Sequence, residues 1–132
     1  MTTAIIGTAV LAALVFALGF NVSRMRGVTA KTGGSQLPTD PSSPLFKAIR
    51  AHGNAAEYVP TLIVLFLLVG ARSPAVIAVP LIVGATAARL LHAYAMLRAR
   101  SLATPSASRV VGAAGTYGFG LALAIAVSAS LL

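Results

Sequence analysis

The residues best suited to binding or catalysis form a short polar stripe inside an otherwise apolar segment. The stripe starts at Arg50, continues with Asn54 four residues later and Glu57 seven residues later, and has Tyr58 beside them. On an α-helix this spacing places a guanidinium, an amide, a carboxylate and a phenol along one side. Ionisable groups within apolar helices are costly in lipid, so they usually face a bundle interior or a wet cavity and are partnered. The stripe therefore predicts a buried ligand site or a buried ion pair.

A second set of polar residues, Arg89 and His92, lies three residues apart in a later apolar segment. This spacing puts both side chains on one helical face. Glu57 is the only carboxylate within any of the apolar segments, and its expected partner is Arg50 or Arg89. Such a pair could simply fix the register of two helices, because buried ion pairs often serve specificity more than stability. That structural role stays open beside the ligand-binding one.

Several other chemistries are disfavoured by composition. The chain has no cysteine, so thiolate metal sites and cysteine nucleophiles are excluded. Two histidines and two carboxylates are too few for a convincing metal cluster; they are His52, His92, Asp40 and Glu57. The sequence contains neither a phosphate-binding loop of the Walker type nor a dinucleotide fingerprint. We therefore expect no metal and no nucleotide.

The elements that must position these residues are membrane helices. Of the 132 residues, 58% are hydrophobic and 9% are charged, whereas a soluble domain carries about 25% charged residues. The apolar residues form four blocks, each near the roughly 20 residues that a helix needs to cross a bilayer. The blocks cover residues 4–22, 45–69, 74–97 and 106–132. These features predict an all-α, integral membrane four-helix bundle that forms a single domain over residues 1–132.

Local signals support these borders. Three hydroxyl–proline pairs each supply a cap and a first-turn proline for a helix: Ser43-Pro44, Ser73-Pro74 and Thr104-Pro105. Residues 24–43 form a long connection rich in turn-forming Gly, Ser, Pro and Asp. The other two connections are short, so we expect consecutive helices to pack antiparallel.

The net charge of +8 is concentrated at helix ends. Basic residues gather around the first connection (Arg24, Arg26, Lys31, Lys47) and the third (Arg98, Arg100, Arg109), whereas the second has only Arg72. By the positive-inside rule, the first and third connections are cytoplasmic and both termini lie on the other side. The charge is expected to contact anionic lipid headgroups, with no nucleic acid as a partner.

The string Arg50-x-His52-x-Asn54-x-x-Glu57-Tyr58-x-Pro60 resembles the signature of the MAPEG family, the membrane-associated proteins in eicosanoid and glutathione metabolism. The similarity covers essentially the whole chain, because the length, the four spans, the long first connection and the run from Arg89 to His92 all fit. It is closest to the small bacterial members. The resemblance thus implies a multi-pass protein of the bacterial inner membrane.

The resemblance also implies a homotrimer that binds glutathione between neighbouring subunits near the cytoplasmic face. The residues matching the family's glutathione-binding positions are Arg50, Asn54, Glu57 and Tyr58. A residue at the place of His52 contributes from the adjacent subunit, and Arg26 corresponds to a further carboxylate-binding arginine. Arg89 and His92 on the third helix complete the expected glutathione site. Glutathione would be a co-substrate.

In the family's enzymes an arginine near the start of the fourth helix favours the thiolate, and Arg109 is the candidate here, with Arg98 and Arg100 as substitutes. The sequence departs from those enzymes at two tyrosine positions, occupied here by Met96 and by a small residue after Arg109. The implied function is a membrane-bound enzyme that conjugates glutathione to lipophilic electrophiles or reduces lipid hydroperoxides. The alternatives are a non-catalytic binding or scaffold protein of the same fold and a small exporter that uses Glu57.

Overall fold

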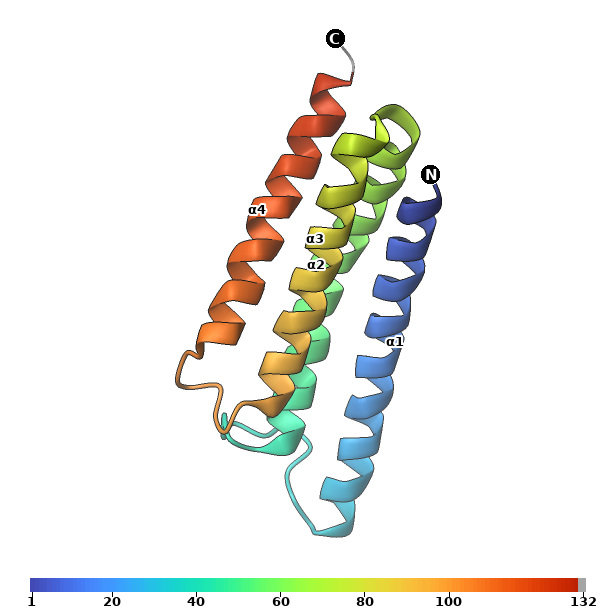
Figure 1. Ribbon diagram of the computed structural model, residues 1–132. Helices are drawn as coiled ribbons and strands as arrows, with labels where there is room; N and C mark the ends of the chain where they lie inside the picture. The colour runs from blue at the N-terminus through green and yellow to red at the C-terminus, as the bar shows by residue number, and fades with distance from the viewer. Residues whose placement is uncertain (131–132) are drawn as a thin grey trace.

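The computed structural model describes residues 1–130, which form a bundle of four antiparallel helices (Figure 1). The helices are α1 (Thr2–Lys31), α2 (Pro44–Arg72), α3 (Ala75–Arg98) and α4 (Ala107–Ala129). Each of the four is long and apolar enough to cross a bilayer. The predicted all-α membrane bundle is therefore confirmed, and the chain is a multi-pass membrane protein.

The two connections flanked by most of the basic residues meet at one end of the bundle, and the described parts of both termini lie toward the other end with the short α2–α3 turn (Figure 1). The backbone N–H of Leu102 donates to the carbonyl of Pro41 over 2.9 Å. The Lys47 ammonium donates to the carbonyl of Ala99 over 3.0 Å. These bonds join the first connection and the start of α2 to the third connection, so this end of the bundle is held together by polar contacts.

Helix α1 extends beyond its predicted end at residue 22 and continues to Lys31, which shortens the connection from the expected 24–43 to 32–43. Its 30 residues span about 45 Å, well beyond the roughly 30 Å of the hydrocarbon core. The loss of hydropathy after residue 22 therefore does not mark the end of the helix. The helix stops where Gly33 adopts a positive φ of 68°.

The other helix borders agree with the sequence to within three residues where the structure describes them, and the largest difference is the end of α2 at Arg72 instead of residue 69. Ser43 caps α2, with its hydroxyl accepting a hydrogen bond from the backbone N–H of Phe46 over 3.3 Å, and Pro44 occupies the first turn. Helix α4 is described to Ala129. The last two residues of the predicted fourth span, Leu131 and Leu132, lie outside the described residues.

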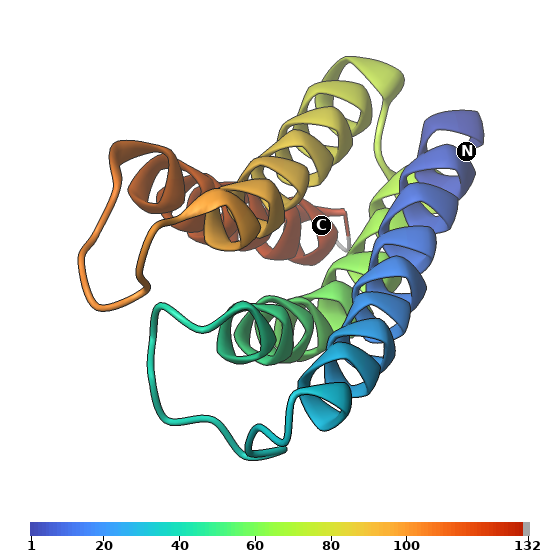
Figure 2. The ribbon, with the colours of Figure 1, turned by 90° about the horizontal axis from the view of Figure 1, so that it is seen from below.

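Viewed from the connection end, α2 and α3 lie between α1 and α4 (Figure 2). Within residues 1–130, α1 packs on α2 and α3, α4 packs on α3 and α2, and α1 and α4 do not touch. Consequently α1 and α4 both present broad outward surfaces, and the interior is formed mainly around α2 and α3.

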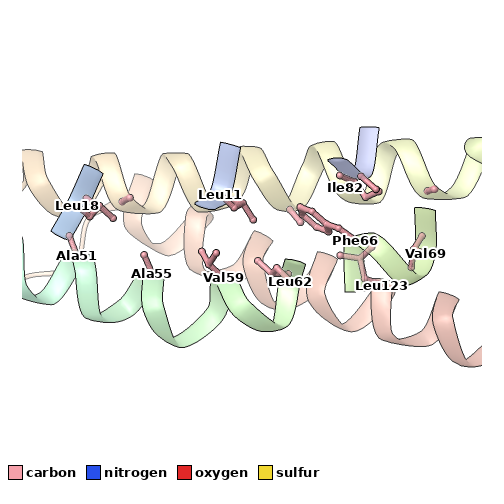
Figure 3. Close-up of a cluster of buried hydrophobic side chains, with 14 of the residues drawn as sticks. Leu11, Leu18, Ala51, Ala55, Val59, Leu62, Phe66, Val69, Ile82 and Leu123 are labelled. Carbon is pink, nitrogen blue, oxygen red and sulfur yellow. The ribbon is translucent and has the colours of Figure 1, made fainter. Parts of the chain in front are cut away.

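The interior is packed closely through small residues. Leu18 of α1 lies beside Ala51 of α2, Leu11 lies opposite Val59, and Phe66 and Ile82 fill the space farther along (Figure 3). A Cβ added at Gly7 would come within 2.8 Å of Ile82 Cγ2 and 3.0 Å of Phe66 Cε2. In lipid, where apolar surface gains nothing by leaving the solvent, such van der Waals fit supplies much of the association energy of helices.

Candidate functional site

The centre of the candidate site is Arg89, which joins the polar stripe of α2 to α3. Its side chain is only 1% exposed although it lies within a membrane helix. The guanidinium Nη2 donates to Asn54 Oδ1 over 2.9 Å. The guanidinium carbon lies 5.3 Å from the centre of the Tyr58 ring, a cation–π distance. Two of the stripe residues predicted from the sequence therefore meet the α3 arginine directly.

The Arg89 guanidinium is incompletely satisfied. Its Nε is buried and has no hydrogen-bond partner in the described part of the chain. A buried donor without a partner costs about 1–3 kcal/mol, and an amide oxygen and an aromatic ring compensate a buried charge less well than a carboxylate does. An anion placed beside Asn54 and Tyr58 would supply the missing compensation. The cluster is thus suited to a negatively charged ligand.

The expected ion pair between Glu57 and an arginine does not form within residues 1–130. Over residues 1–130, Arg89 bonds to Asn54, and neither Arg50 nor Glu57 forms a salt bridge. Both of these charged side chains are exposed on the outer surface of α2. Charged groups in this setting usually face a bundle interior or a wet cavity. The two charged groups are therefore open to contact from outside the described chain.

His52 lies on a different side of α2 from the stripe and faces α1. A Cβ added at Gly19 would lie 3.3 Å from His52 Nε2. Arg26 lies in the last turns of α1, where its side chain is exposed and its carbonyl accepts a hydrogen bond from Gln36 Nε2 over 3.4 Å. Within one subunit, the structure does not bring either residue to the Arg89 cluster. Their predicted contacts with glutathione stay predictions.

His92 and Arg109 connect α3 to α4 and to the loop between them. His92 Nδ1 lies 3.0 Å from the carbonyl oxygen of Arg109. The Arg109 Nη1 donates to the carbonyls of Leu102 over 3.3 Å and Thr104 over 2.9 Å, and its Nε is buried without a partner in residues 1–130. Part of the Arg109 guanidinium therefore holds the loop in place, and its catalytic role stays a prediction.

Sequence reasoning missed Tyr117 of α4. Its hydroxyl oxygen lies 3.2 Å from that of Tyr58, and the two ring centres are 5.7 Å apart with their planes inclined by 57°. The available signal was the occurrence of a single phenol in a segment made mostly of Gly, Ala and Leu. That signal does not say which side of α4 faces α2, so the pairing of Tyr117 with the stripe required the structure.

The two tyrosines form one wall of an apolar cavity between α2 and α4. Its volume is about 430 Å³, which is within the range of small-molecule sites. The remaining lining residues are mostly aliphatic or small, among them Leu62, Leu65, Gly120 and Leu121. The polar cluster around Arg89 and an apolar cavity therefore share Tyr58 as a common boundary.

The second carboxylate of the chain, Asp40, has a local role in the first connection. The Ser42 hydroxyl donates to its carboxylate over 2.7 Å, and the Ser42 backbone N–H donates over 2.8 Å. These bonds, chiefly the one from the hydroxyl, hold the pKa of Asp40 below its ordinary value. Asp40 therefore stabilises a turn.

The fold and the site define a class of protein: a helical membrane bundle with a buried cationic cluster beside an apolar cavity. The chain belongs to the MAPEG family, whose family model matches residues 4–129. The family predicted from the α2 motif is thereby confirmed, and membership supports a membrane protein of the glutathione and eicosanoid metabolism kind. No curated protein and no solved structure matches the chain.

Proposed function

We propose that this protein is a membrane-bound glutathione transferase or peroxidase that acts on lipophilic electrophiles or lipid hydroperoxides. The observation that carries the proposal is the position of the Arg89–Asn54–Tyr58 cluster directly beside the apolar α2–α4 cavity. A reaction between a polar anionic thiol and a lipophile needs a polar site and an apolar site in contact. Holding the two reactants in register is a large part of what such a catalyst can contribute.

The residue types of the stripe suit glutathione, which carries two carboxylates and one ammonium. Arg50 offers a guanidinium fork for a carboxylate, and Glu57 offers an acceptor for the ammonium. Arg89, with its unpartnered Nε, adds positive charge from the interior, and His92 completes the α3 side of the site. A free thiol has a pKa of about 8.5, so nearby positive charge is needed to raise the thiolate fraction at neutral pH.

Arg109 is the residue that we propose stabilises the thiolate. Its Nη1 is bonded to loop carbonyls, but its buried Nε has no partner among residues 1–130 and keeps a donor for an incoming anion. A preorganised donor of this kind can lower the activation free energy by about 2.7–4 kcal/mol, which is roughly a hundredfold to a thousandfold in rate. The loop contacts would then fix the direction in which the guanidinium is presented.

A homotrimer would explain why Arg50 and Glu57 are exposed on a lone subunit. A second copy that covers this surface would bury the charged pair around glutathione bound at the subunit boundary. In this arrangement Arg26 and His52 contact glutathione held by a neighbouring copy. The bacterial inner membrane, with the basic connections in the cytoplasm and both termini on the opposite side, is the proposed setting, because glutathione is supplied from the cytoplasm.

The first test is calorimetric titration of glutathione into the detergent-purified protein, together with turnover assays on an aryl halide and a lipid hydroperoxide. We expect Arg50→Ala to raise the glutathione dissociation constant by at least about tenfold, since it removes a charged hydrogen-bond partner worth about 1.5–3 kcal/mol. Arg72→Ala is the matched control, because Arg72 is an exposed arginine at the opposite end of the same helix. An equal effect of both changes, or no binding at millimolar glutathione, would contradict the proposed site.

A binding or scaffold protein is the second candidate, and the observation that favours it is the engagement of Arg109 with the carbonyls of the third connection. Glutathione binding without turnover on either acceptor would select this function. The exporter alternative makes a different prediction for Glu57→Gln. An exporter would lose transport, whereas a glutathione enzyme would lose mainly glutathione affinity.

A further inference from the structure

We infer that Tyr117 forms an oxygen-binding subsite in the wall of the α2–α4 cavity, where its hydroxyl donates a hydrogen bond to the leaving oxygen of a lipophilic hydroperoxide. The inference rests on the proposed function and deepens it, since it distinguishes oxygen-bearing acceptors from other electrophiles. It assigns a catalytic role to a residue outside the α2 motif. The supporting observations are the hydroxyl pair with Tyr58, the nature of the cavity and the position of Arg89.

Only one of the two O–H groups of the Tyr58–Tyr117 pair is used by the hydrogen bond between them. Each phenol carries a single O–H, and at 3.2 Å one of the two hydroxyls donates to the other. The remaining O–H is free to donate to a third group. Tyr117 is 53% exposed beside the cavity, so its hydroxyl is accessible to a molecule bound there.

Arg89 determines which of the two phenols is the internal donor. Its guanidinium carbon lies 5.3 Å from the Tyr58 ring centre. A cation over an aromatic face draws electron density from the ring and so makes the Tyr58 O–H the better donor of the pair. This favours Tyr58 as the donor to Tyr117, and with that direction the O–H of Tyr117 is the one presented to the cavity.

Two threonine hydroxyls also line the cavity, which is otherwise mostly aliphatic. That of Thr116 is already bonded to the carbonyl of Gly112 over 2.8 Å. That of Thr61 is an aliphatic alcohol, a much weaker acid than a phenol, so Tyr117 is the better proton donor to a leaving oxygen. An apolar acceptor with one oxygen to stabilise fits such a site. A free fatty acid or a phosphate ester would bring a full negative charge into an apolar wall and would be disfavoured.

In the proposed step, the glutathione thiolate attacks the terminal oxygen of the hydroperoxide and the O–O bond breaks. The alkoxide that leaves takes the proton of Tyr117 and becomes the alcohol, while glutathione is oxidised to its sulfenic acid. A second glutathione thiol returns a proton to Tyr117 and, as the thiolate, displaces hydroxide from the sulfenic acid to form the disulfide. The hydroxide becomes water with the proton released when the first thiolate formed. An aryl halide needs no such proton, because its leaving group departs as halide.

The test compares Tyr117→Phe with Tyr94→Phe in the purified full-length protein. Tyr94 is a matched control, because it is a tyrosine on α3 that is 62% exposed and does not line the cavity. With cumene hydroperoxide as the probe, Tyr117→Phe is expected to lower kcat by at least about tenfold, a minimum set below the roughly 10²–10⁴-fold that a positioned general acid contributes. Turnover of chlorodinitrobenzene should change by less than about twofold, because halide leaves without a proton. The glutathione dissociation constant should likewise change by less than about twofold. Tyr94→Phe should alter none of these quantities.

Each other outcome has a definite meaning. Unchanged hydroperoxide turnover in Tyr117→Phe overturns the inference while leaving the enzyme proposal in place. Equal losses with both acceptors also overturn it, because a purely structural role for Tyr117 would affect both reactions alike. A wild-type protein that binds glutathione but turns over neither acceptor overturns the enzyme proposal, and the inference falls with it.

Discussion

Two helix contacts of this bundle are built in opposite ways. Where α1 meets α2 and α3, Gly7, Leu11 and Leu18 lie against alanine, Phe66 and Ile82, and the contact is apolar and closely fitted. Where α2 meets α3 nearer the connection end, Arg89 is buried against an amide and a phenol ring with one donor unpartnered. The first contact is fully packed, whereas the second leaves the Nε of Arg89 without a hydrogen-bond partner in the described part of the chain.

The difference separates the residues that hold the fold from those that serve function. Close packing of small residues gives van der Waals energy at no desolvation cost. A buried guanidinium carries a large desolvation penalty, and well-packed apolar replacements for buried charges are often neutral or stabilising. We therefore expect added volume at the apolar contact to lower the free energy of unfolding. Changes in the Arg89 cluster should lower ligand affinity and leave folding intact.

The largest effect on stability is expected for Gly7→Ala. Its new Cβ would lie 2.8 Å from Ile82 Cγ2 and 3.0 Å from Phe66, and both of those side chains are buried. Overpacking of this kind costs about 1–3 kcal/mol, to be measured as the free energy of unfolding in mixed micelles. Gly118→Ala is the matched control, because nothing lies within 4 Å of its Cβ position, and helix propensity should leave it neutral or slightly stabilising. Equal behaviour of the two variants would remove the distinction between the two contacts.

A smaller but more informative effect is expected for Arg89→Met. Methionine roughly keeps the length of the side chain and removes the buried charge, so the free energy of unfolding should stay the same or rise by about 1–2 kcal/mol. Glutathione affinity, measured by calorimetry on the same sample, should fall by about tenfold because the ligand loses an interior positive charge. If instead Arg89→Met unfolds the protein, the cluster is part of the structural framework and the comparison between the two contacts is wrong.

The smallest effect on global stability is expected for Arg109→Met. This change removes the bonds to the carbonyls of Leu102 and Thr104, so the connection at 99–106 should be cleaved faster by added protease. The free energy of unfolding should fall by about 1 kcal/mol. Arg100→Met, at an exposed arginine of the same connection, should leave the cleavage rate unchanged. Faster cleavage with unchanged aryl halide turnover would assign Arg109 to the loop and not to the thiolate.

The sequence alone was sufficient for the number of helices, their approximate borders and the family. Apolar runs near 20 residues can satisfy their backbone groups in lipid only as helices, and Ser43 and Pro44 mark the start of α2 chemically. Charge was also informative, since the two connections flanked by most of the arginines and lysines do share one end of the bundle (Figure 1). The end of α1 was missed because hydropathy reports the membrane border, whereas a helix can continue into the headgroup region.

Only the tertiary structure decided which polar groups meet. A membrane helix is apolar around most of its circumference, so hydropathy does not distinguish the side that faces a neighbouring helix from the side that faces lipid. The fit of small residues such as Gly7 and Gly112 against their neighbours sets the approach and rotation of the helices. That rotation directs Arg89 to Asn54 and not to Glu57, turns His52 toward α1, and brings Tyr117 to Tyr58.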